Sequence, residues 1–231
     1  MNDGIWCRWI QAHVPRGATV IDVGAADGRF TDVLAAAVGP TGHVIAIEPH
    51  PAAAARLSGR LWPALKTVHA VALGATTGQA ELLVPADGAW SHCSIVPGAV
   101  PHGVETRLPV PVVTLDAITA DLAHVDFIKV DAQGSEPAII AGASRWWGHP
   151  DTVWVIEMWA HGVACAGVDL SAWIAEMARV YDPVVLDWWP SATTWPIVEA
   201  AVREQSTWAA VNVGLFPRPV PLWAQTALAA A

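Results

Sequence analysis

Apolar and polar positions along the chain follow two periods, one typical of buried strands and one typical of helices. Residues 19–23 are apolar and β-favouring apart from one acid, which indicates a strand buried on both faces. Residues 4–13 instead carry a helical stripe, with apolar side chains at positions 5, 6, 9, 10 and 12. The same patterns predict further strands at 43–47, 67–73, 80–84, 110–114, 125–131, 152–157, 184–187 and 208–216. They predict further helices at 29–38, 51–60 and 116–122, after Ser135, and at 170–179.

Strand and helix alternate along most of the chain, which indicates an α/β fold with a doubly wound sheet. We find no linker, repeat or change of composition, so residues 1–231 are expected to form a single domain. Residues 85–109 hold turn residues and no sustained period, and a loop of that length in a compact domain is usually functional or mobile. We expect this loop to be a lid, with Trp90, Ser91, His92 and Ser94 facing a ligand.

The turn after the first strand marks the expected ligand site. It reads Gly24-Ala25-Ala26-Asp27-Gly28, between a buried strand and the start of a helix. In open α/β sheets a ligand binds in this crevice, where a glycine lets it approach the backbone closely. Glu48 ends the next strand, 26 residues after Asp22, where a carboxylate can accept both hydroxyls of a ribose.

Three interpretations of the turn are open on spacing alone. A dinucleotide fold needs Gly-x-Gly-x-x-Gly to make room for a pyrophosphate, and this turn lacks that spacing. Acids at positions 22 and 27 disfavour a pyrophosphate and suit a cationic ligand. The third interpretation is an ordinary strand-to-helix turn with surface acids.

Composition narrows the class of protein. With 54% apolar and 14% charged residues, the chain is expected to be globular with a large core. A net charge of −9 and the absence of a basic stripe argue against nucleic acid as a partner. We find neither a signal peptide nor an apolar run of roughly 18 residues that could span a membrane, so we expect a cytoplasmic protein with no membrane partner.

Tryptophan is the unusual residue of this chain. There are fourteen, against one tyrosine and three phenylalanines, and ten of them follow position 140. They fit core packing and a homo-oligomer interface, or alternatively an aromatic substrate pocket. The three cysteines lie far apart, without the spacing of a zinc site or a disulfide framework.

Three segments, taken in order, resemble the motifs of a known family. Asp22-Val-Gly-Ala-Ala-Asp-Gly28 and Ile47-Glu-Pro49 look like the cofactor motifs of class I S-adenosylmethionine-dependent methyltransferases. Residues 127–137, Phe-Ile-Lys-Val-Asp-Ala-Gln-Gly-Ser-Glu-Pro, resemble the signature of the FkbM-type members, as does Val71-Ala-Leu-Gly74. The similarity covers about residues 20–157, with a weaker echo at 212–218.

The resemblance implies a fold, a cofactor and a reaction. It implies a Rossmann-like, seven-stranded, mostly parallel sheet with the last strand antiparallel, and O-methylation of a small molecule such as a natural product or sugar. S-adenosylmethionine would lie along the strand ends, with Glu48 on its ribose. The other residues that the resemblance assigns to the cofactor are Asp22, Gly24, Ala25, Asp27, Gly28, Phe30, Pro49, Ala72 and Asp131.

One position departs from the family pattern. Gln133 stands where the family usually has a glutamate, and Ser135 stands where alanine is common. A neutral amide takes no proton and is a poorer ligand for a hard cation. We therefore do not favour a divalent metal, and we assign no metal ligands; none of the nine histidines forms a pair with metal-ligand spacing.

Four residues are candidates for catalysis. A sulfonium methyl is already activated, so the enzyme has to align the acceptor and help to remove its proton. Asp131 and Glu157 end two predicted strands, and Lys129 and His161 lie within loop reach of them. For Lys129 the alternative is structural: on a strand it would point away from Asp131 and pair with an acid on a helix.

The leading hypothesis is therefore a methyltransferase that acts on a hydroxyl, or on a carboxylate, of a small molecule. An NAD-dependent oxidoreductase is the first alternative, which the glycine spacing disfavours. The second is a non-catalytic binding module that keeps the fold, for which Gln133 is the one hint.

Overall fold

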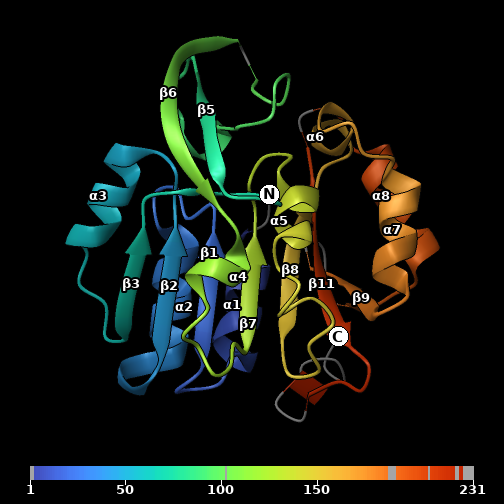
Figure 1. Cartoon of the computed structure of the whole chain (residues 1–231). Helices are drawn as coiled ribbons and strands as arrows, with labels where there is room; N and C mark the ends of the chain where they lie inside the picture. Colours follow the sequence, from blue (N-terminus) through green and yellow to red (C-terminus); the bar gives the residue numbers. More distant parts are fainter. Residues whose placement is uncertain (1–2, 102, 187–190, 208, 222–223, 226–231) are drawn as a thin grey trace.

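The computed structural model describes residues 3–101, 103–186, 191–207, 209–221 and 224–225. Its main sheet has the order β10-β9-β11-β8-β7-β1-β2-β3 within these residues (Figure 1). The strands are β1 (Thr19–Val23), β2 (His43–Ile47), β3 (Leu65–His69), β7 (Phe127–Val130), β8 (Val153–Met158), β9 (Tyr181–Val185), β10 (Ser191–Ala192) and β11 (Val211–Pro217).

The direction of the strands confirms the predicted fold class. β3, β2, β1, β7 and β8 pair in parallel, and β11 runs antiparallel between β8 and β9. The sheet is thus seven-stranded and mostly parallel with its last long strand antiparallel, and the two-residue β10 extends it at one edge. Every residue of β1, β7, β8 and β11 is buried, as expected for a sheet covered on both faces.

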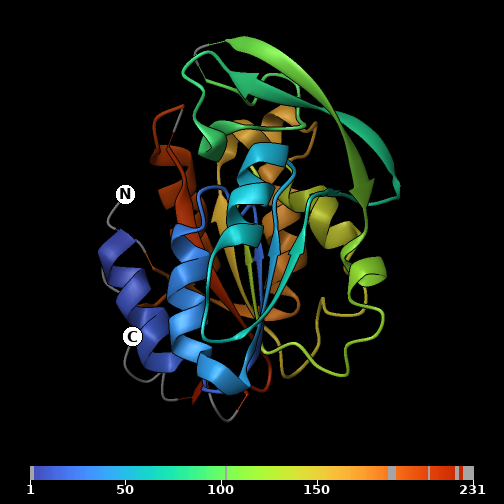
Figure 2. The ribbon, with the colours of Figure 1, turned by 90° about the vertical axis from the view of Figure 1, so that its left-hand side faces the viewer.

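Helices cover both faces of the sheet. On one face, α1 (Asp3–His13) and α2 (Arg29–Val38) bury Ile10 and Leu34 against β1 and β2, and α3 (Pro51–Gly59) packs beside them. On the other face, α5 (Glu136–Ala141), α7 (Leu170–Ala178) and α8 (Trp195–Glu204) bury Ile139, Ile174 and Val198. α4 (Leu115–Ile118) and α6 (Ala160–Cys165) complete this layer, and Figures 1 and 2 show the sheet between the two sets.

A second, smaller sheet corrects three predictions. Its order is β4-β6-β5, from β4 (Ala72–Leu73), β6 (Val104–Val113) and β5 (Gly78–Pro85). The strand predicted at 67–73 is split between β3 and β4, and the strand predicted at 80–84 is longer, as β5, and forms an antiparallel edge of the small sheet. The strand predicted at 110–114 is the end of the ten-residue β6, which lies in the middle of the small sheet.

The predicted lid of 85–109 is therefore too long, because residues 104–109 belong to β6. Residues 104–107 are exposed, so this half of the strand has no buried face and shows no alternation in the sequence. It is held as a strand by pairing with β5, from Leu82↔Leu108 to Val84↔Thr106. The loop that remains is 86–103, with a short 3₁₀ helix, η2 (Trp90–His92).

The C-terminal third contains two helices that the sequence did not predict. The segment between the strands predicted at 184–187 and 208–216 looks turn-rich, yet its residues 195–204 form α8, which buries Val198, Ala201 and Val202 at helical spacing. Pro196 at the first turn begins this helix rather than breaking it. The other unpredicted helix is α6. The ends of the strands predicted at 184–187 and 208–216 include residues outside the described ones.

Most of the described tryptophans belong to the core. Trp146, Trp154 and Trp173 are buried against the α5–α7 face of the sheet, where core packing accounts for them. Trp188, Trp189, Trp208 and Trp223 lie outside the described residues. The single domain and the homo-oligomer remain predictions. None of the described helices combines the length and the apolar character needed to cross a membrane.

Candidate active site

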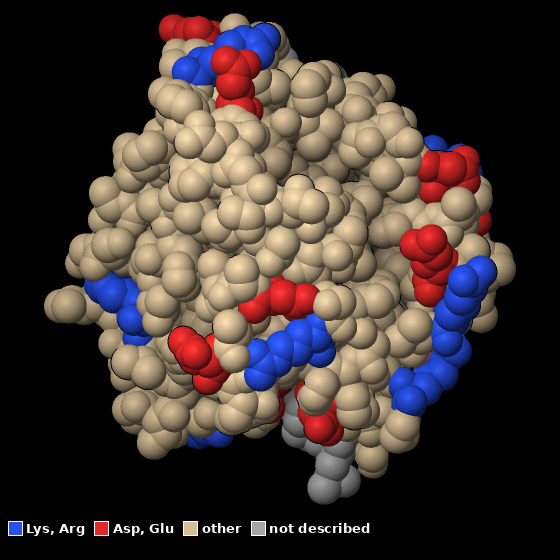
Figure 3. Space-filling model, viewed as in Figure 1, with Lys and Arg blue, Asp and Glu red and all other residues tan. Residues whose placement is uncertain are grey.

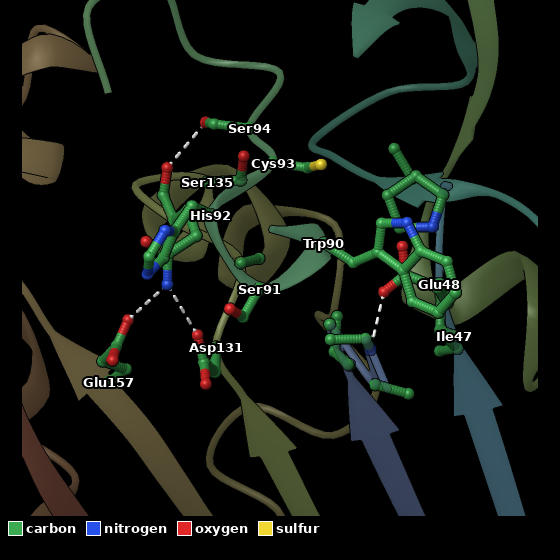
Figure 4. Close-up of a pocket in the computed structure, with 18 of the residues that line it drawn as sticks. Ile47, Glu48, Trp90, Ser91, His92, Cys93, Ser94, Asp131, Ser135 and Glu157 are labelled. Atoms are coloured by element: carbon green, nitrogen blue, oxygen red, sulfur yellow. Dashed lines mark hydrogen bonds between the residues drawn. The ribbon is translucent and has the colours of Figure 1, made fainter. Parts of the chain in front are cut away.

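A cavity of about 560 Å³ lies at the carboxyl ends of β1, β2, β7 and β8. The turn after β1, the end of β2 and the residues after β7 form its floor, and the loop 86–103 covers it (Figure 4). Ala209 and Ala210, just before β11, also contribute to the wall. It is the crevice that the fold class predicts for a ligand.

The turn after β1 is shaped by close backbone contacts. Gly24 has φ +74°, and a Cβ on it would lie 1.7 Å from the carbonyl oxygen of Asp131. The amides of Gly24 and Ala25 donate to the carbonyl of Ile47 at 2.9 and 3.1 Å. Ala26 also lies in the left-handed region, at φ +47°. The chain therefore needs glycine at position 24 to bring the ends of β1, β2 and β7 together.

Glu48 ties this turn to the end of β2. One carboxylate oxygen accepts from the amide of Ala26 and the other from the amide of His50, each at 2.7 Å. The side chain lines the cavity although little of it is exposed. Burial raises the pKa of Glu48 to about 7, although the two amide donors act in the opposite direction.

Lys129 lies between two carboxylates in the floor of the cavity. Its Nζ is 3.2 Å from Oδ1 of Asp22 and 3.4 Å from Oδ2 of Asp131, and it lies 4.8 Å from the ring centroid of Phe30. Burial alone would lower the pKa of Lys129, but the two carboxylates outweigh burial and raise it. The lysine is therefore a permanent cation that holds Asp131. The expectation that Lys129 points away from Asp131 is wrong, because residues two apart on a strand share a face.

Asp131 and Glu157 meet at Gln133. The side-chain amide nitrogen of Gln133 donates to Oδ1 of Asp131 and to Oε2 of Glu157, both at 2.9 Å (Figure 4). Glu157, the penultimate residue of β8, is buried. Burial, followed by the neighbouring charge of Asp131, raises the pKa of Glu157 well above its usual range. The pair thus combines Glu157, whose protonated form is favoured by burial, with Asp131, a carboxylate held by Lys129.

Glu136 shapes the loop that carries Gln133. Its two oxygens accept from the amides of Ala132 at 2.7 Å and Gly134 at 2.9 Å. Burial raises the pKa of Glu136 to about 7. Since both oxygens bind backbone on either side of Gln133, Glu136 organises the loop and does not line the cavity.

The loop 86–103 contacts both ends of the cavity. Oγ of Ser94 donates to the backbone carbonyl of Gln133 at 2.7 Å (Figure 4). At the other end the ring of Trp90 lies 5.5 Å from the ring of His50, and the guanidinium of Arg56 is 5.9 Å from the Trp90 ring. Trp90, Ser91, His92 and Ser94, expected to face a ligand, all line the cavity.

The cavity gathers most of the residues expected at the site and leaves three outside. Those that line it are Gly24, Ala25, Asp27, Phe30, Glu48, Pro49, Ala72, Lys129, Asp131 and Glu157. Asp22, Gly28 and His161 are not among its lining residues. Asp22 is fully buried and accepts from Oγ1 of Thr31 at 2.6 Å. His161 Nε2 lies 3.1 Å from the carbonyl oxygen of Gly98 in the loop and 3.4 Å from the sulfur of Cys165.

Three of the lining residues that sequence reasoning missed bear on the chemistry of the site. Ser135, expected only as a helix cap, is buried at the cavity wall, and its Oγ has no hydrogen-bond partner among the described residues. Trp159 follows β8 directly, and that position at a strand end was the available signal. Gln133 was considered only because it stands in place of a glutamate, and its hydrogen bonds to Asp131 and Glu157 were not predicted. Among the described residues, no three His, Cys, Asp or Glu side chains are placed to hold a metal ion.

Comparison with known proteins gives one match by sequence and several by fold. Residues 22–179 match the family model described as the Methyltransferase FkbM domain. The structure resembles Methyltransferase FkbM from Methylobacillus flagellatus KT, with a TM-score of 0.52 and 19% identity over 87% of this chain. That match covers 44% of the other protein, so this chain spans less than half its length. At this identity the likeness shows the fold alone.

A weaker likeness is to the O-methyltransferase TomG from Streptomyces achromogenes, which is involved in tomaymycin synthesis and was solved with S-adenosylmethionine. Its TM-score is 0.48 at 15% identity, over 92% of this chain and 78% of that one. No match was found among curated proteins.

Proposed function

The chain belongs to the FkbM methyltransferase family, and on this premise we propose that it transfers the methyl group of S-adenosylmethionine to a hydroxyl oxygen of a small molecule. One observation carries the proposal: a single cavity joins a glycine turn and Glu48 at one end to the Asp131–Glu157 pair at the other. The first end suits a nucleoside-bearing cofactor, and the second offers a proton acceptor for a hydroxyl.

Three features fit the cofactor. Gly24 lets the turn after β1 lie directly against the Asp131 backbone, where a side chain would clash, and so brings the turn and Asp131 to the same cavity. Each oxygen of Glu48 accepts one backbone hydrogen bond and keeps a lone pair, so the carboxylate can still accept the hydroxyls of a ribose. The buried hydroxyl of Ser135 is left for a polar group of a bound molecule.

S-adenosylmethionine, when bound, supplies a methyl group activated by its positive sulfur. The protein's part is to orient the acceptor and to take its proton. Asp131 is the proposed base, because it lines the cavity while Lys129 and Gln133 fix its two oxygens. With the cofactor bound, its carbon–sulfur bond would break as the methyl group moves to the acceptor oxygen, leaving S-adenosylhomocysteine, and Asp131 would accept the hydroxyl proton. A positioned base of this kind contributes about 10²–10⁴-fold to a rate.

Charge favours a hydroxyl over a carboxylate as the acceptor. An anionic acceptor would have to lie against the carboxylate of Asp131, while Lys129 is already engaged by Asp22 and Asp131. Like charges at that distance oppose binding in a buried site. The family assignment leaves the oxidoreductase alternative without support, and the turn lacks the dinucleotide spacing.

We also propose that the loop 86–103 is the lid of this site. Its contacts at Ser94 and Trp90 hold it over the two ends of the cavity. Closure of this kind excludes water from the reaction and completes the binding site.

Titration calorimetry with S-adenosylhomocysteine tests the cofactor part of the proposal. We expect one molecule to bind per chain, and Glu48→Gln to weaken binding by about 10–100-fold, the usual worth of hydrogen bonds to a charged group. Glu105→Gln, on the exposed part of β6, is the matched control and should bind like the natural protein. No binding to the folded natural protein would refute the proposal.

The pH dependence adds a second check in the same experiment. The ribose hydroxyls donate to the ionised form of Glu48, whose pKa without ligand is raised to about 7. Affinity should therefore be highest above pH 7 and fall as the pH is lowered through that value, and Glu48→Gln should lose this dependence. A panel of phenols, sugars and carboxylic acids then decides about catalysis: binding without any methylated product would indicate a non-catalytic module.

A further inference from the structure

Gln133 occupies the space between the two carboxylates of the site. Its amide nitrogen carries two hydrogens, and the two partners at 2.9 Å are oxygens of Asp131 and Glu157. Its backbone lies at φ +49°, a left-handed conformation that is uncommon for a residue other than glycine. Strain of this kind persists where the surrounding structure enforces it, often at functional sites.

The surroundings of Gln133 enforce this conformation from both sides. Glu136 binds the amides of Ala132 and Gly134, the two neighbours of Gln133 in the chain. Gly134 lies at φ +96°, and a Cβ on it would be 2.9 Å from the carbonyl oxygen of Gly162. The loop is therefore held tightly, and the Gln133 side chain reaches the two carboxylates.

Two carboxylates that converge in a buried site need a shared proton, a cation, or hydrogen-bond donors between them. Lys129 contacts Asp131 on the oxygen that Gln133 does not bind. Gln133 donates to the Glu157 carboxyl, which is also hydrogen-bonded to the side chain of Asp131. Oxygen ligands of this type are also those that a divalent cation prefers, so a metal ion bound by both side chains would be the other solution.

We propose that Gln133 is a positioning residue for the methyl transfer: its amide holds Asp131 and Glu157 together in place of a divalent cation, so that the reaction needs no metal. The inference rests on the proposed function, and it goes beyond it by assigning a role to Gln133.

Manganese binding tests the proposal without any acceptor. Mn²⁺ alone is added to the natural protein and to Gln133→Glu, and binding is followed by electron paramagnetic resonance. Gln133→Glu replaces the amide by a third carboxylate and should bind one Mn²⁺ about tenfold or more tightly than the natural protein, because affinity rises with the number of charged ligands. Gln79→Glu adds the same charge on the exposed edge of β5 and should match the natural protein.

Two results of the manganese experiment would overturn the inference. In one, the natural protein itself binds one Mn²⁺ that is lost in Glu157→Gln. In the other, Gln133→Glu binds no better than Gln79→Glu. Thermal unfolding of each variant confirms that it is folded before it is compared.

Turnover separates this inference from the proposed function. With any acceptor that the panel reveals, the natural protein should keep its activity in the presence of a metal chelator. Gln133→Ala should lower kcat about 10²-fold, the usual cost of misplaced catalytic groups, with the affinity for S-adenosylhomocysteine unchanged. If turnover stops with chelator and returns with Mg²⁺, the role of Gln133 is refuted and the proposed function stands. If S-adenosylhomocysteine does not bind, the proposed function itself is refuted.

Discussion

The pairing of Asp22 with Lys129 shows how single residues of this site depend on the fold. Asp22 and Lys129 are partners in the register of β1 and β7, and their charged groups lie 3.2 Å apart in the interior. A buried charge is tolerated when it is paired, and removing one partner is costly. Lys129 in turn holds Asp131. Asp22 does not line the cavity, but through Lys129 it helps to hold Asp131, which does.

Replacing Asp131 by asparagine tests the base directly. The amide keeps the size of the side chain and cannot take a proton, so kcat should fall by about 10²–10⁴-fold. Lys129 retains Asp22, so the variant should fold and bind S-adenosylhomocysteine within a few-fold of the natural protein. Steady-state kinetics with an acceptor from the panel measures the effect.

Asp121→Asn, at an exposed position, is the control for this change. Equal turnover in Asp131→Asn and Asp121→Asn would remove Asp131 from the mechanism.

At the scale of single residues, the sequence predicts which residues of the first motifs line the cavity, but not which side chains contact each other across the sheet. Gly24 and Glu48 follow from spacing along one strand–turn–helix unit, and both line the cavity. The partners of Asp22 and Gln133 depend on which strands are neighbours, which spacing alone does not reveal. Their contacts with Lys129 and Glu157 exist because β1, β7 and β8 are adjacent.

Among the elements, the turn after β1 has the least freedom. Gly24 combines a left-handed backbone with the close approach of the Asp131 carbonyl. Gly24→Ala should destabilise the protein by roughly 2–3 kcal/mol, since strained backbone alone costs about 1–3 kcal/mol. The melting temperature should fall by about 5–10 °C, at about 2–4 °C per kcal/mol for a chain of this size.

Gly59→Ala is the matched control, because nothing lies within 4 Å of its added Cβ at the end of α3. It should melt at the same temperature as the natural protein or slightly above it. Calorimetric melting curves for the two variants that coincide would show that the turn tolerates a side chain.

The helices and strands that were predicted best are those whose buried residues recur at regular spacing. β1, β2 and α2 place buried residues at regular spacing, so their boundaries were predicted within one or two residues. β6 fails because its first half is exposed and is held by pairing with β5. α8 fails because the segment that contains it looks turn-rich, with Pro196 in the first turn of the helix, although Val198, Ala201 and Val202 follow a helical stripe.

For the whole molecule, buried acids determine how stability depends on pH. The surface is sparsely charged, and Figure 3 shows Lys and Arg scattered among acidic residues on the face viewed. Inside, Glu48 and Glu136 have pKa values raised to about 7, and burial also raises the pKa of Glu157 well above its usual range. Through these three acids the folded chain binds more protons than the unfolded chain between the unfolded pKa of these groups, near 4.5, and about 7. Burial lowers the pKa of His43, His50 and His69 and so acts in the opposite direction, but the shifts of the acids are larger.

Without ligand, the protein should thus be more stable at pH 5.5 than at pH 8. A raised folded pKa stabilises the acid form, and this contribution is lost as the pH rises through the folded value. For Glu136 a rise from 4.5 to about 7 corresponds to at most about 3 kcal/mol, at 1.36 kcal/mol per pKa unit. Melting curves across this range measure the total change.

Glu136→Gln should show a smaller gain on acidification than the natural protein, and Glu105→Gln should show the full gain. A natural protein that melts at a higher temperature at pH 8 than at pH 5.5 would contradict the prediction.

The loop 86–103 has a further consequence for the rate of the cycle. It contacts the two ends of the cavity through Trp90 and Ser94, and His161 approaches Gly98 between them. As the proposed lid, it has to release all three contacts before a product can diffuse away, and to form them again for the next substrate. Each turnover then includes one mechanical opening, and where such a step is slow, solvent viscosity rather than bond making determines the speed of the enzyme.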